Sequence, residues 1–343
     1  MRYRQLGHTG VEVSSQCLGA MMFGAMGNQD HDECIAMIHT ALDAGINFID
    51  TADVYSQGES EEIVGKAITG RREEVVLATK CFNQMGAGRN RQGGSRRWIL
   101  EAVEASLRRL NTDYIDLYQT HRFDSTTDLD ETLGALTDLV RAGKVRYLGS
   151  SSYPVERIVE AQWVAERRHR ERFVCEQPQY SIFARSTEAA VLPTCQRYGV
   201  AVIPWSPLAG GWLTGKYRRG EKAPAGSRFS ADSFFSRRSG GGPDLDEDPR
   251  AELVERLSAV ADQAALTLTQ MSLAFVDSHP AVTSPIIGVR TPQQLQDALS
   301  AADVTLDLDT LDAIDEICKP GRDAPRTSHF VANPALDAAN RRR

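Results

Sequence analysis

The sequence lacks several features that define common protein classes. No stretch approaches the ~20 apolar residues that a membrane-spanning helix needs. The first residues, MRYRQLGHTG, contain no apolar run of the kind found in secretory signals. The six cysteines are scattered and none forms a C-x-x-C pair, which is typical of reduced thiols. These absences predict a protein that stays in the cytoplasm.

Motifs for several kinds of chemistry are absent too. There is no Walker loop and no G-x-S-x-G elbow, which removes the commonest signatures of nucleoside triphosphatases and hydrolases. No G-x-G-x-x-G follows the first predicted strand, as it normally does in a doubly wound dinucleotide-binding sheet. The histidines of HDECIAMIH lack the spacing of zinc ligands, so no metal is expected. A net charge of −7 argues against a nucleic-acid or membrane partner.

Eight short runs, many rich in β-branched residues, alternate with amphipathic segments along the chain. The runs cover residues 17–20, 47–52, 75–80, 114–121, 147–152, 173–179, 201–208 and 284–289. The intervening segments, such as HDECIAMIHTALDAG, carry apolar residues at three- and four-residue steps, which predicts helices. Strand-helix alternation of this kind favours parallel βαβ units with right-handed crossovers. We therefore expect an α/β fold of the TIM type, a closed (β/α)8 barrel.

The barrel is expected to span residues 1–318 as a single domain. Residues 2–15 contain two short extended runs separated by glycines, which predicts an N-terminal β-hairpin that plugs the barrel bottom. Long loops are expected at the C-terminal face of the barrel. The longest, residues 218–249, is either an active-site flap or a mobile insertion. The tail, residues 319–343, loses periodicity and is expected to be partly disordered.

The final predicted unit carries a clear helix start. Thr291 is an expected N-cap, Pro292 suits the first helical position, and Gln294 completes a capping box. This pattern predicts a strand, a short loop and a helix, in that order.

Four residues with complementary chemistry end or follow successive predicted strands. Asp50, Lys80 and His121 end the second, third and fourth strands, and Tyr55 follows Asp50 closely. Because neighbouring parallel strands lie about 4.8 Å apart and end on the same face of a barrel, one pocket can hold all four side chains. Lys80 is expected to lower the pKa of the Tyr55 phenol, Asp50 to hold Lys80, and His121 to bind a carbonyl oxygen. The set predicts an acid catalyst for hydride transfer.

Each of these residues also has a structural interpretation when it is considered alone. Asp50 suits a helix cap, Tyr55 loop packing, Lys80 a solvated strand end, and His121 a core histidine. The joint pattern on successive strands favours catalysis. Lysine is also scarce in a chain with 39 basic residues, so a lysine that ends an apolar strand is informative.

Further sequence blocks occur in a fixed order along most of residues 1–318. They are GINFIDTADVYSQGESEEIVGKAI, VVLATK, DYIDLYQTHRFD, VRYLGSSSYP, QPQYS, PWSPLAGGWLTGKY and PIIGVRTPQQL. In these blocks the chain resembles the aldo-keto reductase superfamily, especially its bacterial branch akin to potassium channel beta subunits. The resemblance implies a barrel that binds NADP(H) without a Rossmann motif. It also implies that Asp50, Tyr55, Lys80 and His121 form the catalytic tetrad.

The resemblance extends to a set of cofactor-binding residues. They are Gly19, Ala20, Met21, Asp50, Ser151, Ser152, Gln177, Trp205, Ser206, Pro207, Leu208, Gly210, Lys216, Arg228, Gly288, Arg290, Gln294 and Asp297. Ser151 and Gln177 match residues that hold the carboxamide, and Trp205 matches the ring stacked on the nicotinamide. Ser152 and Ala298 stand where many relatives have asparagine. Arg290, beside the start of a helix, suits the 2′-phosphate.

These expectations describe an NADPH-dependent reductase of aldehydes, with ketones as further candidate substrates and Tyr55 as the proton donor. The expected substrate pocket contains Met21, Phe23, Tyr55, Phe82, His121, Arg122 and Phe123. Two alternatives stay open: a nicotinamide-binding redox sensor with vestigial turnover, and an NAD-linked alcohol dehydrogenase. The physiological substrate and the oligomeric state stay open as well.

Overall fold

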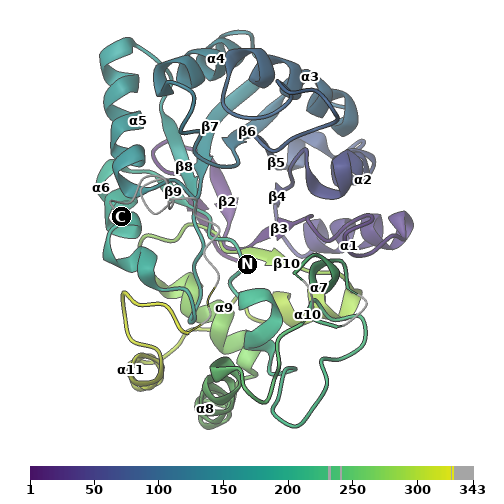
Figure 1. The fold of residues 1–343 in the computed structure, drawn as a ribbon, viewed down its shortest axis with the longest axis vertical. Coiled ribbons are helices and arrows are strands. Elements are labelled where there is room, and N and C mark those ends of the chain that lie inside the picture. Colours follow the sequence, from purple (N-terminus) through teal and green to yellow (C-terminus); the bar gives the residue numbers. More distant parts are fainter. Residues whose placement is uncertain (231–232, 240–241, 326, 328–343) are drawn as a thin grey trace.

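In the computed structural model, eight parallel strands form one curled sheet surrounded by helices (Figure 1). The structure describes residues 1–230, 233–239, 242–325 and 327. The strands are β3 (Cys17–Gly19), β4 (Phe48–Asp50), β5 (Val76–Cys81), β6 (Ile115–Thr120), β7 (Val145–Ser151), β8 (Phe173–Gln177), β9 (Ala201–Val202) and β10 (Ile286–Gly288). They neighbour one another in chain order, and β10 pairs with β3. All eight predicted strands are confirmed.

The two edge strands of the sheet, β9 and β10, also come together, so the sheet closes. Val202 in β9 forms a parallel bridge with Val282, just before β10. The Ile286 amide donates a hydrogen bond to the Pro204 carbonyl at 2.9 Å. The predicted (β/α)8 barrel is therefore confirmed.

Helices connect the strands and cover the outside of the barrel. The α-helices are α1 (His31–Asp43), α2 (Glu59–Ala67), α3 (Arg96–Leu110), α4 (Leu129–Arg141), α5 (Val155–Arg168), α6 (Val191–Tyr198), α7 (Phe234–Ser239), α8 (Pro249–Gln263), α9 (Leu268–Ser278), α10 (Pro292–Leu299) and α11 (Leu308–Ile317). Short 3-10 helices are η1 (Tyr55–Gly58), η2 (Arg72–Glu74), η3 (Ser186–Ala189) and η4 (Ala209–Thr214). The apolar spacing explains the packing, because Met37, Ile38 and Ala41 on one face of α1 are all buried. Within the described part of the chain, no helix is long and apolar enough to cross a membrane.

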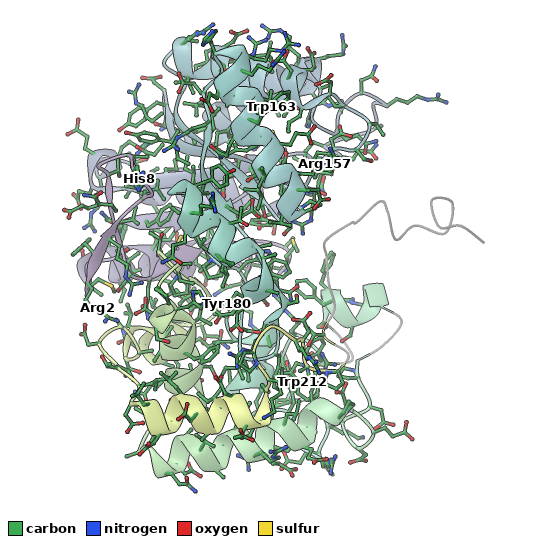
Figure 2. All side chains as sticks on the ribbon, turned by 90° about the vertical axis from the view of Figure 1, so that its left-hand side faces the viewer. Arg2, His8, Arg157, Trp163, Tyr180 and Trp212 are labelled. Atoms are coloured by element: carbon green, nitrogen blue, oxygen red, sulfur yellow. The ribbon has the colours of Figure 1, made fainter. Side chains whose placement is uncertain are left out.

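The predicted N-terminal hairpin is present and seals one end of the barrel. Strands β1 (Tyr3–Gln5) and β2 (Glu12–Ser14) pair antiparallel. Leu6 and Val13 join a buried cluster with inward side chains from the barrel strands, among them Phe48. Arg2 (Figure 2) and Arg4 both pair with Asp277 of α9. The barrel is thus plugged at the end where its strands begin.

The helix start predicted after β10 forms with one difference. The Thr291 hydroxyl accepts from the Gln294 amide, as expected. The Gln294 side chain accepts from the Arg290 amide at 3.0 Å, whereas a capping box would direct it to Thr291. The shifted bond fixes the backbone of Arg290 at the start of α10.

The predicted long loop at residues 218–249 contains α7 and reaches across the carboxyl face. Arg228 contacts the Met22 sulfur, in the loop that follows β3, at 3.8 Å. The Phe229 ring packs on Tyr217 with ring centroids 5.3 Å apart.

The start of the predicted tail, after α11, contacts the barrel. The Ala324 amide donates to the Phe183 carbonyl at 2.8 Å. Most of the tail prediction falls on residues outside the described part of the chain.

Candidate active site

Strand alternation explains why polar side chains gather at the carboxyl end of the barrel. In β4, Phe48 faces the buried interior, and Asp50, two residues later, points the same way one layer higher. The same step of two residues relates Ala78 to Lys80, Leu117 to Gln119, and Cys175 to Gln177. The apolar layer therefore supports a polar layer directly above it.

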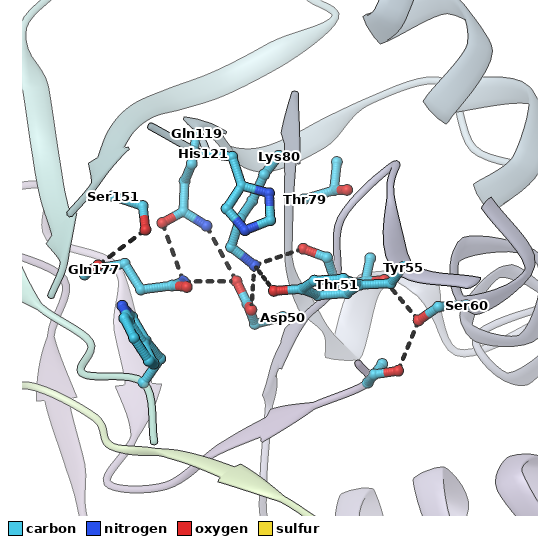
Figure 3. Close-up of polar contacts among 12 residues, drawn as sticks. Asp50, Thr51, Tyr55, Ser60, Thr79, Lys80, Gln119, His121, Ser151 and Gln177 are labelled. Atoms are coloured by element: carbon cyan, nitrogen blue, oxygen red, sulfur yellow. Dashed lines mark hydrogen bonds and ion pairs between the residues drawn. The ribbon is translucent and has the colours of Figure 1, made fainter. Parts of the chain in front are cut away.

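Lys80 is the centre of this polar layer. Its ammonium is fully buried and donates to Asp50 Oδ1 at 2.5 Å, to the Thr51 carbonyl at 2.8 Å and to the Tyr55 hydroxyl at 3.3 Å (Figure 3). An ammonium has three hydrogens, and each has an acceptor here. Burial alone would lower the pKa of Lys80, but Asp50 and then Tyr55 outweigh burial and raise it. Lys80 therefore stays protonated at neutral pH.

Asp50 is held by amides as well as by Lys80. Its Oδ2 atom accepts from Gln119 Nε2 at 3.1 Å and from Gln177 Nε2 at 2.9 Å (Figure 3). Gln177 was predicted from the resemblance, whereas Gln119 was not predicted. The signal for Gln119 is its position two residues after the apolar Leu117 in a strand. The two amides fix the carboxylate that in turn fixes Lys80.

Tyr55 lies in η1, with its hydroxyl directed at Lys80. Its ring meets the His121 ring edge to face, with centroids 5.6 Å apart and an interplanar angle of 84°. Burial raises the pKa of the Tyr55 phenol; Lys80 opposes this effect without overturning it. The expectation of a net lowering is therefore wrong for this structure, because desolvation exceeds the attraction of the ammonium. The phenol keeps its proton at neutral pH.

An unusual turn holds Tyr55 in place. Ser56 and Gln57 have φ angles of 48° and 58°, a region that non-glycine residues seldom adopt. The Ser56 hydroxyl donates to the Phe23 carbonyl at 3.2 Å and accepts from the Met26 amide at 3.1 Å. The loop after β3 and the turn after β4 are thereby joined beside the Tyr55 ring.

His121 is buried and neutral. Its Nδ1 atom lies 3.1 Å from Asn83 Nδ2, which can only donate, so Nδ1 is the acceptor and Nε2 carries the proton. Burial, and then the charges of Lys80 and Arg122, hold the pKa of His121 well below its usual value. The imidazole can therefore donate one hydrogen bond from Nε2. Asn83 was missed from the sequence, where an asparagine in a loop gives no distinctive signal.

The predicted nicotinamide-side residues come together on neighbouring strand ends. The Ser151 hydroxyl donates to the Gln177 carbonyl at 3.0 Å. Trp205 Nε1 donates to the Ser152 hydroxyl at 3.2 Å, and Arg122 lies 3.4 Å from the same oxygen. Ser152 has a φ of 55°. The Ser152 hydroxyl thus links Arg122 and Trp205.

Glu176, which the sequence did not single out, supports this turn from behind. It is fully buried and accepts from the Ser150 hydroxyl and, at 3.2 Å, from the Tyr153 amide. Burial raises the pKa of Glu176 to about 7, although Ser150, backbone amides and Arg122 oppose the rise. The carboxyl group therefore changes charge close to neutral pH.

We expect Glu176 to make stability depend on pH. Because its folded pKa of about 7 exceeds the ordinary 4.5, the folded protein binds the proton more tightly. The stability that comes from this tighter proton binding is fully present below the ordinary pKa of 4.5. It is lost as the pH rises through the folded pKa of about 7. Relative to wild type, Glu176→Gln should gain roughly 2–3 kcal/mol of unfolding free energy between mildly acidic and mildly alkaline pH. Urea unfolding at several pH values measures this difference; a constant difference would contradict the assignment.

Three cations gather near the predicted phosphate end of the cofactor. Lys216, Arg228 and Arg290 form no salt bridge with any residue that the structure describes. Burial, and then the charges of Arg290 and Arg228, lower the pKa of Lys216. Burial chiefly, and Arg290 to a smaller extent, lowers the pKa of Arg228. Mutually repelling cations without a carboxylate are suited to bind an anion.

The loop after β9 adds backbone groups beside these cations. It contains Pro207 and Leu208, and Ser206, Ala209, Gly210 and Gly211 all have positive φ angles. Successive backbone N–H groups in such turns form concave anion sites. Gly211 has a φ of 99°, which favours glycine, and a Cβ there would lie 2.8 Å from Lys216 Nζ and displace the end of that side chain.

The other predicted cofactor residues lie on the first and last strand-helix units. A Cβ on Gly19 would meet the Ile286 side chain at 2.6 Å, which explains the glycine where β3 and β10 pair. The Ala20 amide donates to the Asp50 carbonyl at 2.8 Å, and Met21 follows. Gly288 ends β10, and Asp297 lies on α10, where it accepts from Gln293. Ala298, on the same helix, is buried.

Some of the predicted substrate residues lie together at the active site, whereas others lie in loops or in the core. Tyr55, His121 and Arg122 lie together, since Arg122 donates to the His121 carbonyl at 2.6 Å. Phe82 is partly buried after β5, and Phe123 packs on Tyr153 with centroids 5.4 Å apart. Phe23 is fully buried in the main hydrophobic core. Its ring therefore anchors the loop after β3 to that core.

Comparison with known proteins agrees with this fold. The aldo/keto reductase family model matches residues 17–319. An uncharacterized oxidoreductase, YrpG of Bacillus subtilis, is 38% identical over 95% of this chain and 98% of its own. A probable voltage-gated potassium channel subunit beta of Arabidopsis thaliana is 38% identical over 89% and 92%. The aldo-keto reductase dtxS3 of Metarhizium robertsii is 35% identical over 93% and 92%. The chain belongs to the aldo/keto reductase family.

Proposed function

We propose that this protein is an NADPH-dependent reductase that converts aldehydes, and ketones as a second class, to alcohols. The observation that carries the proposal is the fully buried Lys80, bonded to both Asp50 and Tyr55 and faced by a neutral His121. A structural lysine would not require a phenol and an imidazole at the same point. The experiment that tests the proposal is NADPH oxidation by the wild-type protein with a panel of aromatic aldehydes.

The side chains support proton delivery to a carbonyl oxygen. NADPH, when bound, supplies the hydride that forms the new C–H bond. His121 Nε2–H donates to the substrate oxygen and orients it, and Tyr55 transfers its phenolic proton to the same oxygen. Lys80 stabilises the phenolate left behind, and Asp50 keeps Lys80 charged and in place. A phenol with a raised pKa remains protonated until the oxygen becomes basic during hydride arrival, which couples the two transfers.

The residues fit a phosphorylated dinucleotide. Lys216, Arg228 and Arg290 supply positive charge for phosphate groups, and the turn around Gly210 supplies backbone N–H groups. Arg290 stands at the N-terminus of α10, where the helix dipole also favours an anion. Trp205 offers a ring for the nicotinamide, with Ser151 and Gln177 beside it.

Arg290→Gln is expected to weaken NADPH binding by roughly 10- to 100-fold, the loss of one charge-assisted phosphate contact. NADH binding should change little, because NADH lacks the 2′-phosphate. Isothermal calorimetry with both cofactors measures the effect. Arg219→Gln is the matched control, because Arg219 is on the neighbouring loop and pairs with Glu252 at the surface. Equal weakening for both cofactors would place Arg290 at a phosphate that they share, and a preference for NADH in wild type would favour the dehydrogenase alternative.

A second candidate function is a nicotinamide-dependent regulatory subunit. Several similar proteins are named as potassium channel subunits beta, which favours considering it. The two candidates differ in turnover: a reductase consumes NADPH rapidly with a suitable aldehyde, whereas a sensor binds NADPH and a protein partner with little turnover. The intact hydrogen-bond network around Lys80 favours the reductase.

We further propose that residues 1–318 act as one catalytic domain in the cytoplasm. The family model covers nearly this whole range. All six cysteines are free and buried, which suits a reducing compartment.

A further inference from the structure

A cavity of about 220 Å³ lies behind the catalytic turn, outside the proposed cofactor and substrate residues. It is bounded by the segment after β4, the loop after β5 and one face of α3. Asp53, on its wall, donates its backbone N–H to the Lys80 carbonyl at 3.1 Å. The cavity is therefore directly adjacent to the active site but separate from it.

The cavity wall holds two buried polar groups without partners. Asp53 is 1% exposed, and neither carboxylate oxygen has a hydrogen-bond partner among the residues that the structure describes. The neighbouring Val54 amide stabilises the charge weakly but lies outside hydrogen-bond geometry. Trp98 Nε1 is also buried, and it too has no hydrogen-bond partner within the described ranges. Buried carboxylates are nearly always paired, so this wall is incomplete without an occupant.

The surrounding charges indicate what is missing. Glu61 is fully buried and takes Arg109, whose Nε and NH2 groups lie 2.7 and 2.6 Å from its Oε2. Arg91 at the cavity edge pairs with Glu101 at 3.1 Å. Arg91 and Arg109 both line the cavity, but each has its own carboxylate partner. Among the described residues, Asp53 is therefore the carboxyl group of the wall that has no ion-pair partner.

The ionisation of Asp53 depends on groups from every element around it. Burial, and then Glu61, raise the pKa of Asp53 well above its usual value; Arg109 and the more distant Lys80 oppose the rise. Cys81 and Tyr118 of the neighbouring strands also face it. A cation that binds here would favour the ionised carboxylate and release a proton.

We propose that this cavity binds a short alkylammonium ion through Asp53. The ammonium group pairs with the carboxylate, and the alkyl chain packs on Met85, Ala102 and Ala105 of the lining. The volume suffices, since cavities of about 150 Å³ in other proteins hold benzene. An anionic ligand fits this site less well, because Arg91 and Arg109 of the lining are already paired with Glu101 and Glu61.

Isothermal calorimetry with n-butylammonium tests the proposal. Wild type should bind it saturably, and Asp53→Asn, which preserves the shape of the side chain, should bind it roughly tenfold more weakly or worse. n-Butanol, the neutral analogue of the probe, should not bind. In wild type the binding heat should differ between buffers with different ionisation enthalpies, since a proton is released, and this difference should vanish in Asp53→Asn.

Two further variants keep the test decisive. Ala105→Leu narrows the cavity without removing the carboxylate and should also weaken binding, whereas Tyr55→Phe should leave it unchanged. Thermal unfolding of each variant verifies that it is folded. Absence of saturable binding to folded wild type, or equal affinities of wild type and Asp53→Asn, would overturn the proposal and leave a cavity that holds only water. Neither result depends on carbonyl reduction.

Discussion

Tyr55→Phe is expected to lower kcat/KM for aldehyde reduction by roughly 10²- to 10⁴-fold, the usual contribution of a general acid. The variant loses only the hydroxyl, which accepts a hydrogen bond from Lys80 at 3.3 Å. The ring and its contact with His121 remain, so folding and NADPH binding should be preserved. Steady-state NADPH consumption and calorimetric NADPH binding together measure the separation of binding from turnover.

Tyr3→Phe is the matched control for this substitution. Tyr3 is at the other end of the barrel, is 48% exposed, and bonds through its hydroxyl to the Gly45 carbonyl. Its loss should leave kcat/KM unchanged. Tryptophan fluorescence gives a second binding signal, because Trp205 lies in the site while Trp163 (Figure 2) is on the outer surface of α5. Retention of most of the activity in Tyr55→Phe would rule out Tyr55 as the acid.

Lys80→Met is expected to lower the free energy of unfolding by about 3–5 kcal/mol and to abolish turnover. The substitution leaves Asp50, only 3% exposed, as a buried carboxylate whose ammonium partner is gone. Urea unfolding measures the loss of stability.

The double variant Lys80→Met with Asp50→Asn distinguishes the effect of an unpaired buried charge on stability from the role of Lys80 in turnover. Removing both members of a buried ion pair is much less costly than removing one. Gln119 and Gln177 can still donate to the new amide oxygen. The double variant should therefore regain most of the stability but none of the turnover. A single variant as stable as wild type would contradict the buried ion pair, and a double variant with turnover would contradict the catalytic role of Lys80.

Sequence reasoning locates the strands and the catalytic candidates for a definite physical reason. A parallel barrel directs the carboxyl ends of all its strands to one face, so Asp50, Lys80 and His121 are placed by strand order alone. Predicting Gln119 also requires knowing which side chains of β6 point into the barrel. Predicting Asn83 requires the path of an irregular loop, which no local sequence pattern specifies.

Environment-dependent properties are the part that the sequence does not predict. The sign of the pKa shift at Tyr55 depends on how far burial exceeds the attraction of Lys80. Glu176 looks like an ordinary polar residue in a strand, and only its full burial makes it titrate near neutral pH. The Gln294 side chain bonds one residue earlier than a capping box predicts, because the chain bends before α10.

The central claim is that this chain transfers hydride from NADPH to a carbonyl carbon. The most direct measurement uses NADPH deuterated at nicotinamide C4, incubated with the wild-type protein and a reactive aromatic aldehyde, followed by mass spectrometry of the alcohol. Stereospecifically labelled cofactor should place one deuterium on the carbinol carbon for one of the two labels, with Tyr55→Phe forming almost no alcohol. NADPH that binds tightly yet yields no labelled alcohol from any aldehyde of the panel would contradict the reductase and favour the regulatory subunit.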